Sequence, residues 1–255
     1  MDQIKVELLD YMGDDLAVVD AARVSFNKTS EWEYLEPVAG WKDSDELFEK
    51  AKVLCQSKGR KFQRSINGND QPKVLGVSDE KLINFLATHD HWTPFAHTAL
   101  KFRVAAPVPI RTQCFKHKIG MVENEESRRY ISTTPEIFVP EFFRAKPDGS
   151  IKQGSAGVHE HSPYWKSAYE SSVSVAIATY EGMIQDGICP EQARFILPQG
   201  AIVNWIWTGN LVSFANFYLK RTDSHAQVEV QEVAKKVGAL IEDIFPVSWA
   251  ALTKE

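Results

Sequence analysis

Cysteine is scarce in this chain of 255 residues, and long apolar runs are missing from it. The three cysteines, Cys55, Cys114 and Cys189, are widely spaced and odd in number, which is typical of reduced thiols rather than of a disulfide framework. No apolar run approaches the roughly 20 residues that a membrane helix needs, and the acidic start "MDQIKVELLDYMGDD" lacks the apolar core of a signal peptide. We therefore expect a cytoplasmic protein without a membrane partner.

The chain also lacks an excess of positive charge and the glycine-rich loops of common nucleotide sites. Its formal net charge is −5, from 29 Lys and Arg against 34 Asp and Glu, so nothing global favours a nucleic-acid partner. Neither GxGxxG nor GxxxxGK[ST] occurs, which leaves a Rossmann or P-loop site without support. Hydrophobic residues make up 44% of the chain, which is enough to fill a substantial core.

Hydrophobic periodicity predicts helices with a few strands between them. A period of two predicts strands in "QIKVELLDY", "ALKFRVAAP" and "AIVNWIWT". Apolar spacings of three and four predict a helix behind an Asp14 or Asp15 cap, a helix capped by Ser78 and a long helix from about Pro163 to Gln185. A short helix beginning at Pro190, the stretch "NLVSFANFYLKR" and a last helix after "SHAQ", which has the capping-box form, complete the pattern.

This pattern favours an α+β fold in which a mixed or antiparallel sheet packs with several helices. Neither an internal repeat nor a second-domain linker is present, so we expect a single catalytic domain over residues 1–255. The polar, loosely patterned residues 27–77 predict an insertion or lid, and residues 144–163 predict a loop insertion.

Charge is concentrated in "CFKHKIGMVENEESRRY", residues 114–130. Cations held close together repel one another unless solvent or a bound anion such as phosphate compensates, so the stretch is either a solvated loop or a site. Asn124, Glu125 and Ser127 add hydrogen-bonding groups that suit the edge of a heterocycle. Arg194 and Arg221 form a second basic pair at the edges of apolar helices, where a charge near the core generally needs a partner.

Two further polar clusters allow competing interpretations. His89, His91 and His97 in "HDHWTPFAH" could hold a metal, but a helix C-terminal cap followed by a turn is the simpler interpretation, and one of them could instead face a cofactor. The residues of "RTDSHAQ" are sequence neighbours at a helix start. Because the members of a catalytic triad converge from separate segments, Asp223 and Ser224 are better explained as helix caps.

Five blocks, taken together, resemble the flavin-dependent thymidylate synthase family: "ARVSF", "HDHWTPFAH", "QCFKHKIGMVENEESRRY", "ARFILP" and "GNLVSFANFYLKRTDSHAQVEVQ". They occur in the family's order over roughly residues 22–231. The family signature is Arg-His-Arg, a short spacer and Asn-Glu-x-Ser-x-Arg-Tyr. Here it is Lys116-His117-Lys118, a spacer one residue longer than expected, and the run from Asn124 to Tyr130.

The resemblance implies an activity and an assembly. The enzyme would methylate dUMP reductively to dTMP, with 5,10-methylenetetrahydrofolate as carbon donor and NADPH as the reductant of FAD. It would be a homotetramer with FAD and dUMP at subunit interfaces. Because the flavin carries both methylene and hydride in this family, no cysteine nucleophile is needed.

The resemblance also implies site residues. FAD would be held by Ser25, Thr93, Lys116, His117, Lys118, Glu125, Asn210, Leu211, Val212 and Asn216. The nucleotide dUMP would be held by Gln113, Lys116, Glu125, Glu126, Ser127, Arg128, Arg129, Arg194 and Arg221. Arg221 would be catalytic, because a guanidinium can stabilise the charge that develops on uracil as C5 becomes nucleophilic. His91 would lie over the flavin and would be the second catalytic residue.

The chain departs from the family pattern at several of these positions. Lys116 and Lys118 keep the positive charge of the family's arginines but lack the planar fork that makes bidentate contacts, and Val212 stands where an arginine is frequent. Two alternatives therefore remain open. One is a metal-dependent nucleotide hydrolase that uses the three histidines, and the other is a nucleotide-binding homologue with altered catalysis.

Overall fold

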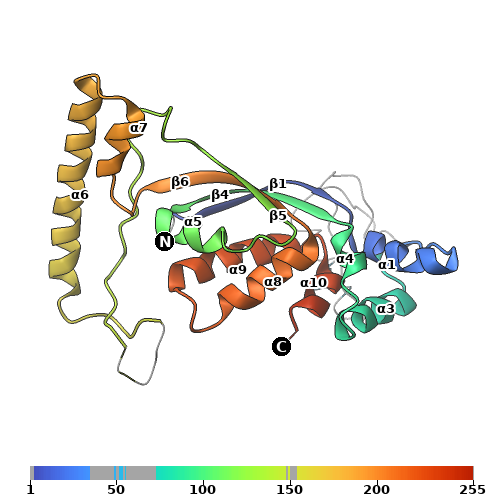
Figure 1. The fold of residues 1–255 in the computed structure, drawn as a ribbon. Coiled ribbons are helices and arrows are strands. Elements are labelled where there is room, and N and C mark those ends of the chain that lie inside the picture. Colours follow the sequence, from blue (N-terminus) through green and yellow to red (C-terminus); the bar gives the residue numbers. More distant parts are fainter. Residues whose placement is uncertain are drawn as a thin grey trace. The chain divides into compact units, whose positions relative to one another are not determined.

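We analysed a computed structural model of the chain, which describes residues 3–34, 73–147 and 154–254 together with 49, 52, 53, 55 and 149. The chain forms two compact units, each built from three segments. The first comprises Met1–Leu9, Lys101–Thr208 and Lys220–Lys235, and the second comprises Asp10–Leu100, Gly209–Leu219 and Lys236–Glu255. Figure 1 shows the elements coloured along the sequence. The expectation of a single domain over residues 1–255 stays a prediction.

A four-stranded antiparallel sheet has the strand order β1-β4-β6-β5. Its strands are β1 (Lys5–Met12), β4 (Ala99–Pro107), β5 (Met121–Glu125) and β6 (Ile202–Gly209). The three strands predicted from their alternating pattern are confirmed, and in β4 the side chains of Leu100, Phe102 and Val104 are fully buried. The α+β fold class is therefore confirmed.

Sequence patterning did not predict β5. Its residues "MVENE" bury only Met121, because β5 is the last strand in the sheet order and needs little apolar surface. The turn before it places Gly120 at φ +69°, a conformation that glycine adopts without strain, and the Met121 N–H donates to the Lys118 carbonyl at 3.3 Å. This turn accommodates the long spacer of the family signature.

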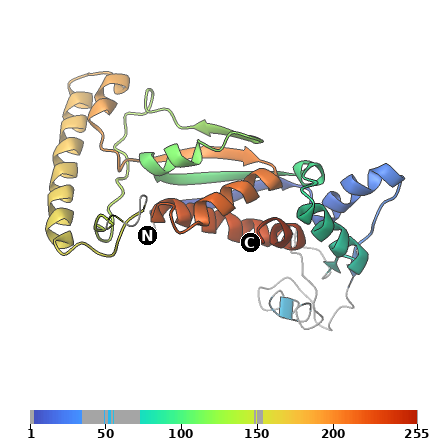
Figure 2. The same cartoon turned by 60° about the horizontal axis from the view of Figure 1, so that its bottom comes forward.

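Several helical elements lie wholly within the first unit. They are α5 (Val108–Cys114), α6 (Ser162–Gln185), α7 (Pro190–Ala193) and the 3₁₀ turn η2 (Arg194–Ile196). The predicted long helix and the short helix beginning at Pro190 are confirmed. Figures 1 and 2 show α7 beside the upper end of α6, and both α7 and η2 contact α6. In the predicted loop insertion 144–163, an isolated antiparallel bridge joins Arg144 to Val158 and α6 begins at Ser162; part of this range lies outside the described residues, and the insertion stays a prediction.

The second unit contains most of the remaining helices: α1 (Asp15–Arg23), the 3₁₀ turn η1 (Val24–Phe26), α3 (Val77–Thr88), α4 (Thr93–Ala96), most of α8 (Leu211–Thr222), the end of α9 (Val228–Glu242) and α10 (Pro246–Leu252). A small antiparallel pair joins β2 (Glu33–Tyr34) to β3 (Lys73–Val74). Helix α10 packs on α1 and α3. Most of the expected insertion or lid at 27–77 lies outside the described residues.

Two predicted helix caps, at α1 and at α3, can be compared with the structure. The Asp14 carboxylate accepts from the Ala17 N–H at 3.0 Å, so one of the two alternatives for α1 is confirmed. The Ser78 cap is wrong: α3 begins one residue earlier and Gly76 precedes it, because the Gly76 carbonyl accepts from Asp79 and Glu80 and starts the first turn.

Among the described residues, no helix is both long and apolar enough to cross a membrane.

Candidate active site

The first unit contains a polar cavity of about 510 Å³. It lies between α5, the end of β5 and the segment that runs from η2 into β6. Three guanidinium and two carboxylate side chains line it: Arg111, Arg128, Arg194, Glu125 and Glu126. Five of the nine residues predicted to bind dUMP line this polar cavity, namely Glu125, Glu126, Ser127, Arg128 and Arg194.

Several charged atoms at this cavity are buried without a hydrogen-bond partner: Arg111 Nε, Glu126 Oε1 and Arg128 Nε. Their ion pairs are long, at 3.4 Å between Arg111 Nε and Glu125 Oε2 and 3.8 Å between Arg128 Nη2 and Glu126 Oε1. A buried polar atom without a partner costs about 1–3 kcal/mol, and more when it is charged. A bound polar molecule that supplies both donors and acceptors would remove this cost.

The neighbouring strand β6 holds Glu126 in place through one residue, Asn204. Asn204 in β6 donates from Nδ2 to Glu126 Oε2 at 3.0 Å, and its carbonyl accepts from the Glu126 N–H at 2.9 Å. Burial raises the pKa of Glu125, the Arg111 guanidinium lowers it, and the neighbouring Glu126 charge raises it again. Glu125 is therefore a carboxyl group whose proton affinity responds to what binds beside it.

The other predicted dUMP residues lie outside the lining of the polar cavity. Arg129 is half-exposed and its guanidinium pairs with the Glu191 carboxylate, with 3.1 Å between Arg129 Nη2 and Glu191 Oε2. The Glu191 carbonyl also accepts from Arg194 Nε at 3.3 Å. One residue of α7 therefore contacts both predicted arginines.

Arg221, Gln113 and His117 form a second cluster in the same unit, which we call the Arg221 cluster. Arg221 at the end of α8 donates from Nε to His117 Nε2 at 3.0 Å and from Nη2 to the Gln113 carbonyl at 3.2 Å. Burial, together with the nearby positive charges of Arg221 and Lys220, lowers the pKa of His117 to about 4. At neutral pH the imidazole is therefore uncharged, and its Nε2 lone pair accepts from the arginine.

The lysines on either side of His117 are exposed. The Lys118 ammonium forms an ion pair with the Glu123 carboxylate and lies 5.5 Å from the centre of the Phe115 ring. Cys114, just before them, is buried, and this burial raises the pKa of its thiol to about 12. A thiol with that pKa carries almost no thiolate at neutral pH, so Cys114 is unsuited to act as a nucleophile.

The remaining predicted FAD residues belong to the second unit. Ser25, Thr93 and Asn216 are exposed, and their side chains make no hydrogen bond to any residue that the structure describes, so their hydroxyl and amide groups can bind a ligand. Large exposed apolar side chains accompany them in sequence: Val24, Phe26 and Trp92. Hydroxyl and amide groups next to exposed apolar surface fit a flavin, which combines a flat apolar ring with polar edges.

Two predicted FAD positions already have structural roles. The Asn210 side chain caps α8, because its Oδ1 accepts from the N–H of Ser213 at 2.9 Å and from its hydroxyl at 2.7 Å. The Leu211 N–H donates to the Thr98 hydroxyl at 3.0 Å, and the Leu211 side chain is buried. Val212 is partly exposed on the same turn of α8.

The histidine segment follows the simpler interpretation at His89, whose Nδ1 lies 2.8 Å from the Phe85 carbonyl at the end of α3. The exposed His91 ring packs edge-on against Phe85, with 5.8 Å between ring centres. Within the described part of the chain, no group of three His, Cys, Asp or Glu residues is placed to hold a metal ion. The metal-dependent alternative therefore gains no support from these histidines.

Sequence reasoning missed Arg111, which lines the polar cavity and pairs with Glu125. The available signal was a single charge within the otherwise uncharged stretch "PVPIRTQC". It also gave Gln227 the wrong role. The expected capping box of Ser224 and Gln227 is wrong, because α9 begins only at Val228 and the Gln227 side chain bonds to the side chains of Gln113 and Glu229.

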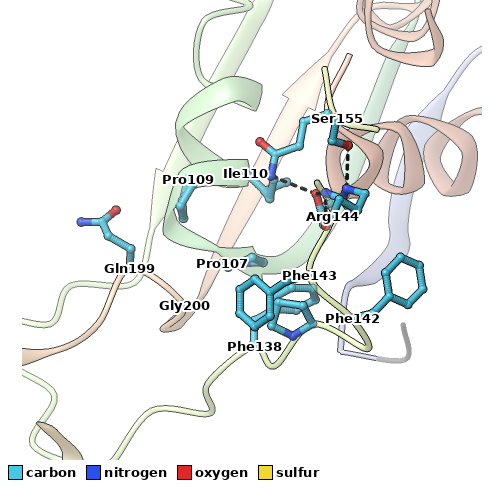
Figure 3. A pocket seen from close by; sticks show the side chains of 13 residues that line it. Pro107, Pro109, Ile110, Phe138, Phe142, Phe143, Arg144, Ser155, Gln199 and Gly200 are labelled. Carbon is cyan, nitrogen blue, oxygen red and sulfur yellow. Dashed lines mark hydrogen bonds and ion pairs between the residues drawn. The ribbon is translucent and has the colours of Figure 1, made fainter. Parts of the chain in front are cut away.

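A second cavity of about 330 Å³ lies on the other side of α5 in the same unit. Figure 3 shows its labelled phenylalanines and prolines, and Arg144 hydrogen-bonded to Ser155 at one end. The Arg144 guanidinium also forms an ion pair with Glu229, with Nη2 at 2.8 Å from Oε1 and 2.9 Å from Oε2. We call this the apolar cavity.

Comparison with known proteins gives concordant results. The chain matches the model of the family described as thymidylate synthase complementing protein (Thy1) over residues 7–247. The flavin-dependent thymidylate synthase of Thermosipho africanus is 30% identical, over 100% of this chain and 92% of that protein, and the one of Kosmotoga olearia is 29% identical over 96% and 88%. The crystal structure of the UMP/dUMP methylase PolB from Streptomyces cacaoi, bound with 5-Br dUMP, has a TM-score of 0.72 at 25% identity and covers 98% of this chain and 94% of that one.

Proposed function

Because the chain belongs to the thymidylate synthase complementing protein family, the flavin-dependent thymidylate synthases, we propose that its polar cavity binds dUMP for methylation. The activity is that of a flavin-dependent methyltransferase that converts dUMP to dTMP. We also propose a role for each site residue, the remaining co-substrates and the oligomeric state.

The observation that carries the nucleotide assignment is the set of buried charged atoms at the polar cavity that have no hydrogen-bond partner. Arg128 Nε and Arg111 Nε are donors and Glu126 Oε1 is an acceptor. A nucleotide monophosphate offers what these atoms lack, since its phosphate oxygens accept hydrogen bonds and its sugar hydroxyl donates one. We assign the phosphate to the guanidinium groups together with the Ser127 hydroxyl, and the sugar hydroxyl to the carboxylates.

We assign the uracil ring to the Arg221 cluster. The hydrogen bonds from Arg221 to His117 and to the Gln113 carbonyl orient the guanidinium before substrate binds. A fixed guanidinium stabilises negative charge that develops on the uracil edge without having to reorganise during the reaction. Because His117 is uncharged at neutral pH, it orients Arg221 without adding a second positive charge against it.

The residues for FAD are the ten named from the family resemblance, with Lys116 and Lys118 as point charges in place of arginine forks. Ser25, Thr93 and Asn216 retain hydroxyl and amide groups for hydrogen bonding, whereas Asn210 and Leu211 contribute through the capped start of α8. Bound FAD would supply the hydride and carry the one-carbon unit to the pyrimidine. His91, exposed beside Phe85, would lie against the flavin as the second catalytic residue.

NADPH is the proposed reductant and 5,10-methylenetetrahydrofolate the proposed carbon donor, both by family resemblance. A homotetramer is also proposed. The 24-residue helix α6 supports it, because α6 buries only Ser162 and Tyr180 while Tyr164, Trp165 and Val175 are exposed. Apolar surface of this kind marks an interaction face. We propose a cytoplasmic enzyme, in agreement with the free thiols of Cys55, Cys114 and Cys189.

The test is dTMP formation from dUMP by the purified protein supplied with FAD, NADPH and 5,10-methylenetetrahydrofolate. Product is expected only when all components are present. Because the similar solved structure is a UMP/dUMP methylase, UMP is the second substrate to test. Tight dUMP binding without flavin binding or product would instead favour the alternative of a homologue with altered catalysis.

A further inference from the structure

A chain of polar side chains connects the apolar cavity to the Arg221 cluster. Glu229, in the first turn of α9, is buried, and its carboxylate pairs with Arg144 beside the apolar cavity. The Glu229 Oε2 also accepts from Gln227 Nε2 at 2.9 Å. The Gln227 Oε1 in turn accepts from Gln113 Nε2 at 2.6 Å. All four side chains lie in the first compact unit.

Because Glu229 is a carboxylate, it fixes the orientation of the side-chain amides of Gln227 and Gln113. A carboxylate held in an ion pair can only accept hydrogen bonds, so the side of the Gln227 amide that faces Glu229 must be its NH₂ group. The Gln227 carbonyl oxygen then faces Gln113 and requires the NH₂ group of Gln113 in return. The orientation of both amides follows from this donor and acceptor order, since either amide turned round would place two acceptors or two donors together.

The Gln113 carbonyl oxygen Oε1 is left over. No residue in the described part of the chain donates a hydrogen bond to it, although the backbone carbonyl of the same residue accepts from Arg221. The Gln113 side chain therefore presents a hydrogen-bond acceptor in the Arg221 cluster, where we place the pyrimidine ring. In uracil, N3 carries the ring's one N–H donor at the pairing edge, whereas in cytosine N3 is an acceptor.

We propose that Gln227, anchored by Glu229 and Arg144, is a positioning residue that holds the Gln113 amide with its oxygen toward the base and thereby selects uracil over cytosine. This inference rests on the proposed function, because it places the pyrimidine of the nucleotide at Gln113. An amide that could rotate freely would offer either a donor or an acceptor and would discriminate poorly between the two bases.

The test is calorimetric binding of dUMP and of dCMP to the wild-type holoenzyme and to Gln227→Met, which keeps the side-chain length but removes both hydrogen bonds. We expect the dUMP dissociation constant to rise about 10-fold, as the loss of one well-placed hydrogen bond predicts, with dCMP binding unchanged or tighter. The preference for dUMP, measured as the dCMP dissociation constant divided by that of dUMP, should therefore fall by at least about 10-fold. Gln231→Met is the matched control, because Gln231 lies in the first turns of α9, which follows Gln227, and donates to the Ala226 carbonyl instead.

A second variant keeps the inference testable if Gln227→Met folds poorly. Glu229→Gln replaces the acceptor-only group by an amide that can turn, so we expect it to lower the preference for dUMP while keeping the hydrogen-bonded chain. If the wild type binds dUMP well and both variants keep its preference within about two-fold, the inference is wrong and the proposed function stands. If the wild type does not bind dUMP, the proposed function fails and this inference fails with it.

Discussion

At the scale of single residues, Arg221 is oriented by its own neighbours before any substrate is present. Its Nε and Nη2 donate to His117 and to the Gln113 carbonyl, which are two separate attachment points on the segment that begins in α5. A guanidinium held at two points loses little freedom when it meets a substrate, which is how a preorganised group lowers a barrier. This preorganisation supports the catalytic role that we propose for Arg221.

Replacing Arg221 should remove turnover and leave the fold intact. For Arg221→Ala we expect kcat to fall by at least about 100-fold, which is typical for the loss of one stabilising donor. The adjacent exposed Lys220→Ala is the matched control and should keep activity within a few-fold. Steady-state kinetics and circular dichroism measure both effects. If Arg221→Ala unfolded the protein, Arg221 would be a structural rather than a catalytic residue.

The pKa of His117 provides a prediction about pH. Its folded pKa of about 4 lies below the ordinary value of 6.5, so between these pH values the unfolded chain binds more protons than the folded one. The stabilisation from this group is therefore present above pH 6.5 and is lost as the pH falls through about 4. NMR titration of the His117 ring should show no protonation near pH 6. A midpoint near 6.5 would mean that the histidine does not accept from Arg221.

At the scale of elements, the buried Asp15 at the start of α1 holds the start of α10. Its carboxylate accepts from the N–H groups of Val247 and Ser248, both at 2.8 Å. These N–H groups belong to the first turn of α10, where helical partners are missing. Despite these hydrogen bonds, burial raises the pKa of Asp15 to about 6.

The elevated pKa predicts a pH effect opposite in sign to that of His117. A carboxyl group whose folded pKa exceeds its unfolded value contributes stability that is present below pH 3.8 and is lost as the pH rises through about 6. Urea unfolding of the wild type and of Asp15→Asn at pH 4 and pH 7 isolates this effect from that of His117. The wild type should lose stability relative to the variant on going to pH 7. An equal difference at both pH values would contradict the assignment.

The same residue allows a test of the cap itself. In Asp15→Ala the two N–H groups of α10 lose their acceptor in a buried environment, and we expect a loss of about 1–3 kcal/mol in the free energy of unfolding at pH 5. Asp14→Ala is the comparison, because that residue caps α1 at its partly exposed end and a loss near 1 kcal/mol is expected. Losses of the same size in both variants would show that burial of Asp15 has little effect.

Elements with a long regular pattern were predictable, whereas among the described short helices only α7, which begins at Pro190, was predicted. The strands β1, β4 and β6 and the helices α1, α6, α8 and α9 follow their hydrophobic spacing. The helices α5 and α10 have seven residues each, too few for a periodic signal, and β5 buries only one of its five residues, Met121. The cap predicted at Ser78 was wrong because the Gly76 backbone carbonyl starts the first turn of α3. The capping box predicted at Gln227 was wrong because its side chain bonds to Gln113, which is distant in sequence.

At the scale of the whole molecule, the residues predicted to bind dUMP lie at three separate places in the fold. The polar cavity gathers five predicted dUMP residues, whereas Gln113 and Arg221 belong to the Arg221 cluster and Arg129 pairs with Glu191. Arg111 could not be predicted, because its pairing with Glu125 depends on how α5 meets the end of β5. Contacts between segments distant in sequence cannot be read from local patterns.

The assembly is testable at the same scale. If α6 lies in an interface of the proposed homotetramer, Trp165→Glu, which places a charge on an exposed aromatic position, should shift the protein to smaller species. Sedimentation velocity measures this directly. The exposed polar Ser172→Glu on the same helix is a control for added charge, and an unchanged tetramer in both variants would place the interface elsewhere.

Binding of dUMP in the polar cavity of the first unit can be tested by measuring the dissociation constant of dUMP for the wild type and for Arg128→Ala. Arg128 lines the polar cavity with a buried, unpaired Nε, so loss of its charged hydrogen bonds should weaken binding by about 10- to 100-fold. Arg103→Ala, at an exposed ion pair with Glu7, should bind dUMP like the wild type. Equal dUMP affinity in wild type and Arg128→Ala, with both proteins folded, would contradict the account.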